Sequence, residues 1–190
     1  MPQFRRWGVA EQGFWRGWFT LPRVVTEGAD KLPRFQPHPQ LETLRKKAIP
    51  WGRKELTAPW TLPDAAETAW EILLEIPAQQ QTGGLLLQVG NCFALELTLV
   101  SRTLHVYVKD TGEQTMQDCG TLQLVPGVPV RLQVFLDRCS AEIFADGKCL
   151  SVNVFDTAPL RPVSLIPQGG TLPLQLLQVW HLQHVMEPQT

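Results

Sequence analysis

The chain has 190 residues, and its 17 Lys and Arg nearly balance its 18 Asp and Glu, which leaves a formal net charge of −1. This balance gives no electrostatic reason to expect nucleic acid or a membrane surface as a partner. Hydrophobic residues make up 44% of the chain and charged residues 18%, a composition typical of a globular protein and not of a disordered one. No apolar run approaches the roughly 18 residues that a membrane-spanning helix needs.

Charge and composition change near Trp60. Residues 1–60 hold 11 Lys and Arg and 5 Asp and Glu, a net of +6, whereas residues 61–190 hold 6 and 13, a net of −7. Residues 1–63 also contain eight of the 16 prolines and five of the seven tryptophans. Proline interrupts helices and strands and tryptophan favours burial, so we expect an irregular segment whose rings pack on another structure. We therefore predict a boundary between residues 1–63 and a domain over 64–190.

One short helix is predicted in the first segment, over residues 40–47, with Leu41, Leu44 and Ala48 on one face. From residue 68 onward the pattern changes to short alternating runs separated by turn residues, which is typical of antiparallel strands. The predicted strands cover residues 68–76, 85–89, 92–100, 103–109, 128–137, 140–145, 148–155 and 171–185.

The clearest local signal is Asp146-Gly147, which separates two alternating runs. Both central residues of a type I′ turn need positive φ, and Asp-Gly supplies them, so this pair predicts the tip of a β-hairpin. Many short antiparallel strands without a long amphipathic helix favour an all-β fold. We expect a two-sheet antiparallel β-sandwich preceded by an irregular linker.

The four cysteines, Cys92, Cys119, Cys139 and Cys149, contain no C-x-x-C pair, which argues against a zinc or redox site. The first residues show no apolar signal-peptide region, so we expect reduced thiols and a cytoplasmic protein. His181 and His184 stand three positions apart in a predicted strand, where they would face opposite sides and could not share a metal ion. No cofactor is predicted.

Asp137 and Glu142 could suggest a pair of catalytic carboxylates. Residues five positions apart in a strand face opposite sides, so we expect Asp137 to end one strand and Glu142 to be hydrogen-bonded or solvated in the next. The basic pairs of the first segment could suggest stacking on nucleic acid, but the acidic remainder of the chain is unfavourable for it. No phosphate-binding glycine loop and no Ser/His/Asp signature occurs.

Two stretches carry a family resemblance. Residues 15–23 (WRGWFTLPR) and 35–45 (FQPHPQLETLR) resemble the segment that closes the catalytic propeller of family 32 glycoside hydrolases, the invertase, levanase and sucrose-6-phosphate hydrolase group. Residues 137–144 (DRCSAEIF), followed by Asp146-Gly147 and by residues 151–155 (SVNVF), resemble a hairpin of that family's sandwich domain. The signature positions, to which we assign a structural role, are Trp15, Pro22, Arg23, Asp137, Glu142, Phe144, Asp146, Gly147 and Phe155.

The resemblance implies that the chain consists of two parts. Residues 1–63 would be the end of a propeller-type catalytic domain and a linker, and residues 64–190 a carboxy-terminal β-sandwich. The family's three catalytic acids lie in propeller motifs that do not occur here, and the pair of carboxyls needed for retaining glycoside hydrolysis cannot be assigned. We therefore expect no catalytic residue, and a structural or accessory module of a β-fructofuranosidase that acts on sucrose, sucrose 6-phosphate or a fructan.

Two other functions stay open at this point. A free-standing, lectin-like carbohydrate-binding module would need an exposed aromatic platform, for which the sandwich offers Trp70, Tyr107, Trp180 and several phenylalanines. A purely structural or oligomerising remnant, for example a homodimer, is the second alternative. Under the favoured reading the partner is a family-type β-propeller, and we expect Trp7, Trp15 and Trp18 to occupy the surface that faces it.

Overall fold

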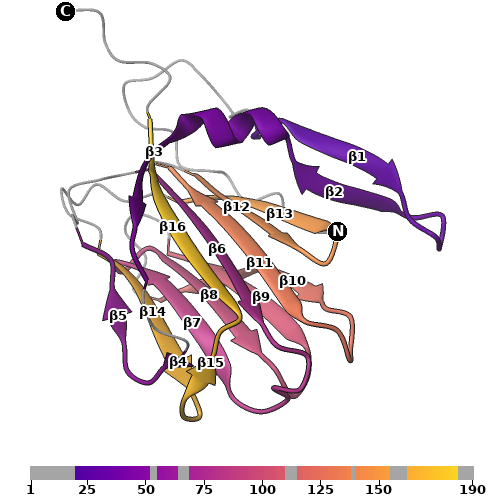
Figure 1. Cartoon of the computed structure of the whole chain (residues 1–190). Helices are drawn as coiled ribbons and strands as arrows, with labels where there is room; N and C mark the ends of the chain where they lie inside the picture. Colours follow the sequence, from indigo (N-terminus) through magenta and orange to yellow (C-terminus); the bar gives the residue numbers. More distant parts are fainter. Residues whose placement is uncertain are drawn as a thin grey trace, which may run out of the picture.

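The computed structural model describes residues 20–51, 55–63, 69–109, 115–137, 140–154 and 162–183. Two antiparallel six-stranded sheets pack face to face and form a β-sandwich (Figure 1), as the alternating pattern predicts. Sheet 1 has the order β10-β9-β8-β7-β14-β5, and sheet 2 has the order β13-β12-β11-β6-β16-β3.

The strands of sheet 1 are β5 (Trp60–Thr61), β7 (Gly84–Val89), β8 (Phe93–Thr98), β9 (Thr103–Val108), β10 (Gln117–Gln123) and β14 (Val163–Gln168). The strands of sheet 2 are β3 (Arg45–Ile49), β6 (Trp70–Ile76), β11 (Val130–Leu136), β12 (Ser140–Ala145), β13 (Lys148–Asn153) and β16 (Leu176–Leu182). Two-stranded pairs join β1 (Arg23–Glu27) to β2 (Pro33–Pro37) and β4 (Glu55–Leu56) to β15 (Leu172–Pro173).

The main core lies between the inner faces of the two sheets. Every second residue of each central strand points into it, and Val130, Leu132, Val134 and Leu136 of β11 are all at most 5% exposed. Period-2 alternation produces this arrangement because successive side chains of a strand leave on opposite faces. His181 is buried with its ring 4.2 Å from that of Trp70, while His184 lies outside the described residues.

The predicted hairpin is confirmed. β12 and β13 pair in register from Ser140↔Asn153 to Ala145↔Lys148, which leaves Asp146 and Gly147 as the two-residue turn. Their φ angles of 50° and 72° are the positive values that a type I′ turn requires.

The first part of the chain is more regular than its proline content predicts. Residues 23–61 contain five short strands, and the predicted helix is a 3-10 helix, η1 (Pro39–Leu44), which ends where β3 begins. Two prolines bound β2, a place that strands tolerate because the lost N–H donor is at the end of the ladder. β3 and β5 are edge strands of the two six-stranded sheets, and the ring of Trp51 packs at a tilt against that of Trp60, with ring centroids 4.5 Å apart.

Candidate functional site

The outer face of sheet 2 is unusual because it buries carboxylates. One cross-strand row runs over neighbouring strands from β13 to β16, and it consists of Ser151, Glu142, Phe135, Glu71 and Trp180. The side chains of Glu142 and Glu71 are only 2% and 0% exposed. An outer sheet face normally meets water, so a second layer must cover this one.

That layer is the segment from Thr20 to Arg45, which contains the β1–β2 hairpin and η1. Between this segment and the sheet lies a second hydrophobic cluster, separate from the sandwich core. Its buried members are Leu41, Ala69, Phe135, Phe144 and Leu182, with Leu21, Phe35, Leu44 and Cys149 half-buried around them. We call the outer side of sheet 2 under this segment the docking face.

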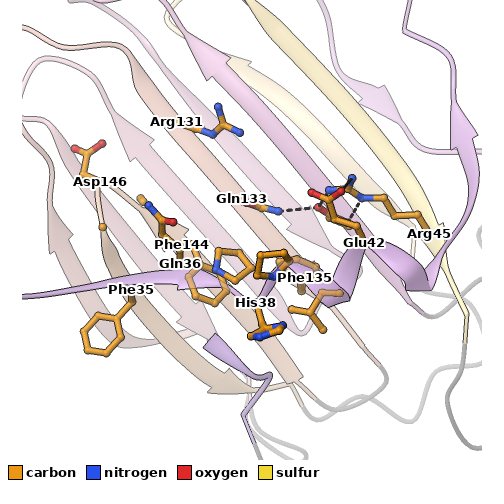
Figure 2. A pocket seen from close by; sticks show the side chains of 16 residues that line it. Phe35, Gln36, His38, Glu42, Arg45, Arg131, Gln133, Phe135, Phe144 and Asp146 are labelled. Carbon is orange, nitrogen blue, oxygen red and sulfur yellow. Dashed lines mark hydrogen bonds and ion pairs between the residues drawn. The ribbon is translucent and has the colours of Figure 1, made fainter. Parts of the chain in front are cut away.

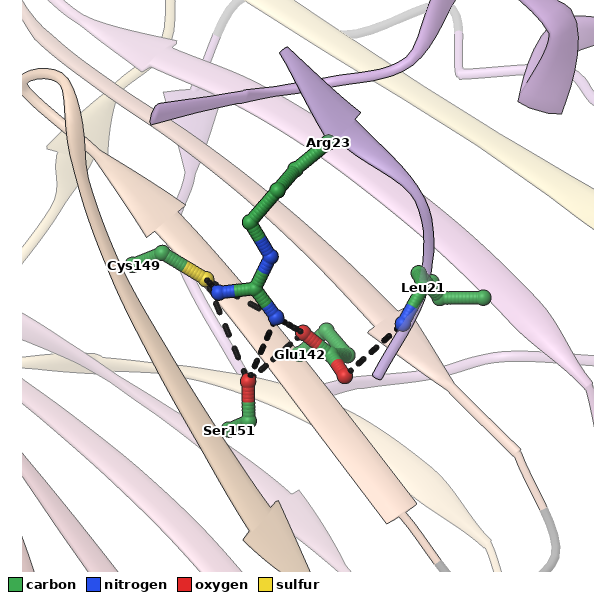
Figure 3. Close-up of polar contacts among 5 residues, drawn as sticks. All are labelled: Leu21, Arg23, Glu142, Cys149 and Ser151. Carbon is green, nitrogen blue, oxygen red and sulfur yellow. Dashed lines mark hydrogen bonds and ion pairs between the residues drawn. The ribbon is translucent and has the colours of Figure 1, made fainter. Parts of the chain in front are cut away.

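Glu142 is the centre of a polar group that ties β1 to the docking face (Figure 3). Its Oε2 accepts hydrogen bonds from Arg23 Nη2 at 3.0 Å and from Ser151 Oγ at 2.7 Å, and its Oε1 accepts one from the Leu21 backbone N–H at 3.1 Å. Arg23 also donates to Ser151 Oγ and to Cys149 Sγ, each at 3.2 Å. We call this group the Glu142 clasp. A buried carboxylate with three donors, one of them a cation, is satisfied, and removing a donor is costly.

The clasp contains a protonated thiol. Burial raises the pKa of Cys149, the positive charge of Arg23 opposes this effect, and the negative charge of Glu142 adds to it. The thiol is therefore a neutral packing and hydrogen-bonding group at physiological pH, and a poor nucleophile.

Glu71 is the centre of a second clasp, which fixes the end of the segment. Arg45 donates from Nε and Nη2 to the two carboxylate oxygens of Glu71, each at 2.7 Å, and Gln133 donates to Oε1 at 2.7 Å. The guanidinium also lies over the ring of Trp180, 4.0 Å from its centroid. Hydrogen bonds to Glu71 raise the pKa of Arg45, so the guanidinium remains a charged donor to this carboxylate.

The hairpin tip makes a third contact with the segment. The Phe35 backbone N–H of β2 donates to the Gly147 carbonyl at 2.8 Å. A Cβ atom on Gly147 would lie 2.5 Å from Cδ of Arg34, so glycine is required both for the positive φ and for the close approach of β2. The carboxylate of Asp146 accepts a hydrogen bond from the Val125 backbone N–H at 2.7 Å, which fixes the tip to the β10–β11 loop.

A cavity of about 440 Å³ lies between the segment and sheet 2 (Figure 2). The rings of Phe135 and Phe144, whose centroids are 6.1 Å apart and which meet edge to face, form part of its wall. The Glu71 clasp lines one side of the cavity, and Arg131, which is 60% exposed, lines another.

These arrangements join the covering segment to the sandwich. Both buried carboxylates are ion-paired, and Asp137 follows β11, where its backbone N–H donates to the Ser140 carbonyl. Within the described ranges no three His, Cys, Asp or Glu side chains are placed to hold a metal ion.

The structure brings three of the nine signature positions together at the Glu142 clasp. Arg23, Glu142 and Phe144 meet in and beside the Glu142 clasp, with the Arg23 guanidinium 5.9 Å from the centroid of the Phe144 ring. The carbonyl of Pro22 accepts a hydrogen bond from the His38 N–H at 3.0 Å. Asp137 stands apart at the other end of the hairpin, and Trp7, Trp15, Trp18 and Phe155 lie outside the described residues.

Sequence reasoning missed the Glu71 clasp. Arg45 and Glu71 are 26 positions apart, and neither stands in a motif that marks them as partners. The one available signal was a glutamate between isoleucine and tryptophan at the start of a buried strand, where an unpaired charge would be costly.

The fold and the docking face define an antiparallel β-sandwich domain that carries a covalently attached segment clasped onto one outer face. Residues 40–181 match the family model described as "Glycosyl hydrolases family 32 C terminal". The chain therefore belongs to that family and is its β-sandwich module. A search of curated proteins finds no match.

Solved structures show the same fold. The exo-inulinase from Aspergillus awamori superposes with a TM-score of 0.70 at 15% identity, over 95% of this chain and 39% of the other. A family 32 β-fructofuranosidase from Bombyx mori gives 0.63 at 18% identity, over 87% and 33%. The sucrose-6-phosphate hydrolase from Lactobacillus gasseri gives 0.63 at 15% identity, over 86% and 33%. The chain thus spans between a third and two fifths of the length of these proteins.

Helices in the described part of the chain are too short and too polar to cross a membrane.

Proposed function

We propose that this module holds the catalytic β-propeller of a β-fructofuranosidase-type hydrolase in place, and that the docking face is where it does so. The observation that carries the proposal is the Glu142 clasp, which joins Arg23 of the propeller-like segment to Glu142 of the sandwich hairpin at 3.0 Å. Both clasps and the contact at Gly147 fix the segment from Thr20 to Arg45 on the docking face. A propeller joined to that segment would therefore be fixed to the sandwich as well.

The β1–β2 hairpin supports this role. It forms a sheet of only two strands, and its turn reaches past the edge of the sandwich (Figure 1). Val25 and Leu32 on this hairpin are each 57% exposed, which is unusual for large apolar side chains and suits a further protein layer. A two-stranded ribbon has marginal stability on its own, and further strands would stabilise it.

Under this proposal the chain divides into a propeller end with linker over residues 1–63 and a sandwich over 64–190, with β3, β4 and β5 pairing across the boundary. The parent reaction is hydrolysis of a terminal β-fructofuranosyl bond in sucrose, sucrose 6-phosphate or a fructan. A cytoplasmic location is part of the proposal, and the free thiol of Cys149 supports it because reduced cysteines are typical of that compartment. A homodimer through exposed strand edges is compatible with it.

A chimera tests the proposal. Residues 20–190 replace the corresponding part of the Aspergillus awamori exo-inulinase, and the half-life of fructose release from inulin at elevated temperature is measured. We expect a longer half-life than for the propeller alone. Glu142→Gln should shorten it, because a neutral amide cannot serve as the anionic acceptor of the clasp. The matched control is Glu55→Gln on β4, where the side chain is exposed.

Two results would contradict the proposal. A chimera no longer-lived than the isolated propeller would show that the docking face does not hold it. Equal losses for Glu142→Gln and Glu55→Gln would show that the Glu142 clasp is not the means.

The chain by itself should release no fructose from sucrose, sucrose 6-phosphate or inulin. Its buried carboxylates, Glu142 and Glu71, form ion pairs with arginines and so do not serve as a catalytic acid and base. The measurement is reducing-sugar release by protein purified from a host without invertase. Turnover of about 1 per second or more, the ordinary range of enzymes, that persists through repurification would refute this expectation.

A further inference from the structure

The outer face of sheet 1 carries a half-exposed pair of rings. Tyr107, the only tyrosine in the chain, stacks on His105 of the same strand, with ring centroids 6.1 Å apart and planes inclined by 19°. Both side chains point away from the core, because Leu104, Val106 and Val108 fill the inner positions of β9. A flat, half-exposed ring pair offers apolar contact area at little cost in side-chain entropy.

Carboxylates flank the rings on both sides. Asp118 on β10 stands directly opposite Tyr107, and Glu96 on β8 stands directly opposite His105. His105 Nδ1 lies 3.0 Å from Thr121 Oγ1 and 3.7 Å from the carboxylate of Asp118, which fixes the orientation of the ring. Partial burial and the nearby Glu96 and Asp118 raise the pKa of Tyr107, so its phenol stays neutral and can donate a hydrogen bond.

A small side chain beside Tyr107, in the row of residues that pair with it across sheet 1, leaves space next to its ring. The next residue across the sheet is Ala94 on β8, followed by Gln88 on β7 and Ser164 on β14. Ala94 is too small to cover the flank of the ring. A ligand ring can therefore lie against Tyr107 and meet amide and hydroxyl groups on the neighbouring strands.

The charge pattern indicates the class of ligand. The six strands of sheet 1 contain no Lys or Arg, and their acidic residues are Glu96 and Asp118. These strands supply two carboxylates and no Lys or Arg, a pattern that does not favour phosphates, carboxylates or nucleic acid, and the cation nearest to Tyr107 along the chain is Lys109, directly after β9. The outward residues are largely hydroxyl and amide side chains, which match a neutral ligand that has many hydroxyl groups.

We propose that the outer face of sheet 1 binds a neutral oligosaccharide, one ring of which stacks on Tyr107 while its hydroxyl groups hydrogen-bond to Glu96, Asp118 and Gln88. This face lies on the side of the sandwich opposite the β1–β2 hairpin (Figure 1), so it stays open when the docking face is covered. The site does not depend on the role proposed for the docking face.

The test uses the full chain, labelled with nitrogen-15, and three linear oligosaccharides: a β-2,1-fructan, a β-1,4-glucan and an α-1,4-glucan. Each is titrated to about 5 mM, beyond the weak end of useful affinities. We expect at least one to shift amide resonances of β8, β9 and β10 and to leave those of β11, β12 and β13 in place. Tyr107→Ala should weaken this binding about tenfold or more, and Tyr107→Phe by much less, because the ring remains.

Matched variants separate binding from folding. Ala94→Lys fills the space beside the ring without removing any group that binds, and it should also abolish the shifts. Gln178→Ala, an exposed change on the outer face of sheet 2, should not alter them. Melting temperatures identify a variant that has unfolded.

Three results would overturn the proposal: no shift with any of the three sugars, shifts confined to sheet 2, or an affinity in Tyr107→Ala and Ala94→Lys that is unchanged from that of the unmodified chain. A lysine-rich peptide that binds more tightly than every sugar would show that the two carboxylates select a cation instead.

Discussion

The two outer faces of the sandwich use the same strand alternation for opposite purposes. The outward positions of sheet 2 include Glu71 and Glu142, which are almost completely buried, and Phe135 and Phe144 between and beside them. Most outward positions of sheet 1 are half-exposed or exposed, and Glu96 is among the half-exposed ones.

The difference arises from the covering segment and not from the sheets. Alternation shows which residues leave the core, but it does not show what those residues meet next. On sheet 2 they meet arginines and apolar side chains of residues 20–45, and on sheet 1 they meet solvent. A carboxylate on an outer face therefore has a structural role only where a partner from a distant part of the chain reaches it.

The largest effect should come from leaving a buried carboxylate without its partner. Arg45→Ala removes the bidentate donor of Glu71 and the contact with Trp180, and we expect it to cost about 3 kcal/mol of unfolding free energy. Urea denaturation of the chain measures it. The control is Arg131→Ala, whose side chain is 60% exposed and 3.8 Å from Glu75, and which should cost less than about 1 kcal/mol. Similar costs for the two would mean that the docking face does not bury charge.

Smaller losses of stability should come from two glycine substitutions, which separate the cost of backbone strain from the cost of the contact between β2 and the hairpin tip. Gly147 and Gly127 have φ angles of 72° and 75°, but a Cβ on Gly127 meets nothing within 4 Å. Gly127→Ala should therefore cost only the strain of a left-handed residue, about 1 kcal/mol. Gly147→Ala should cost more, because Arg34 must move from its position beside Asp30. Thermal unfolding measures both variants. If Gly127→Ala and Gly147→Ala lower the melting temperature equally, the close contact of β2 with the hairpin tip contributes nothing to the cost.

The smallest effect should be a pH dependence at Cys149. Burial raises the pKa of this thiol in the folded chain above its value in the unfolded chain. Its contribution to stability is therefore complete below the unfolded-state pKa and is lost as the pH rises through the folded-state pKa. Melting temperatures measured between about pH 7 and about pH 10 should fall less steeply for Cys149→Ser. Cys119→Ser, at an exposed position, should leave the slope unchanged.

The sandwich could be predicted because its signals are local. Alternation over residues 128–155 and the pair Asp146-Gly147 are sufficient to define β11, β12, β13 and the turn between the last two. The family resemblance likewise came from short, contiguous stretches.

The strands of residues 23–61 could not be predicted in the same way. β3 reads Arg-Lys-Lys-Ala-Ile, a polar run without an apolar face, and it becomes a strand only because β16 supplies a ladder to pair with. Such pairing is a property of the assembled sheet and has no signature within five residues. The clasps are subject to the same limit, since each joins residues that local patterns do not relate.

The Glu142 clasp also has a consequence for the order of folding. Arg23 and Glu142 are separated by 119 positions, so the loop between them must close before the ion pair can form. The entropic cost of closure rises only slowly with loop length, but contacts this far apart form late. During synthesis the covering segment leaves the ribosome long before the β12–β13 hairpin that receives it. Between these two events the covering segment has no sheet face to pack on. Its apolar residues are then exposed, and they can aggregate or bind a chaperone.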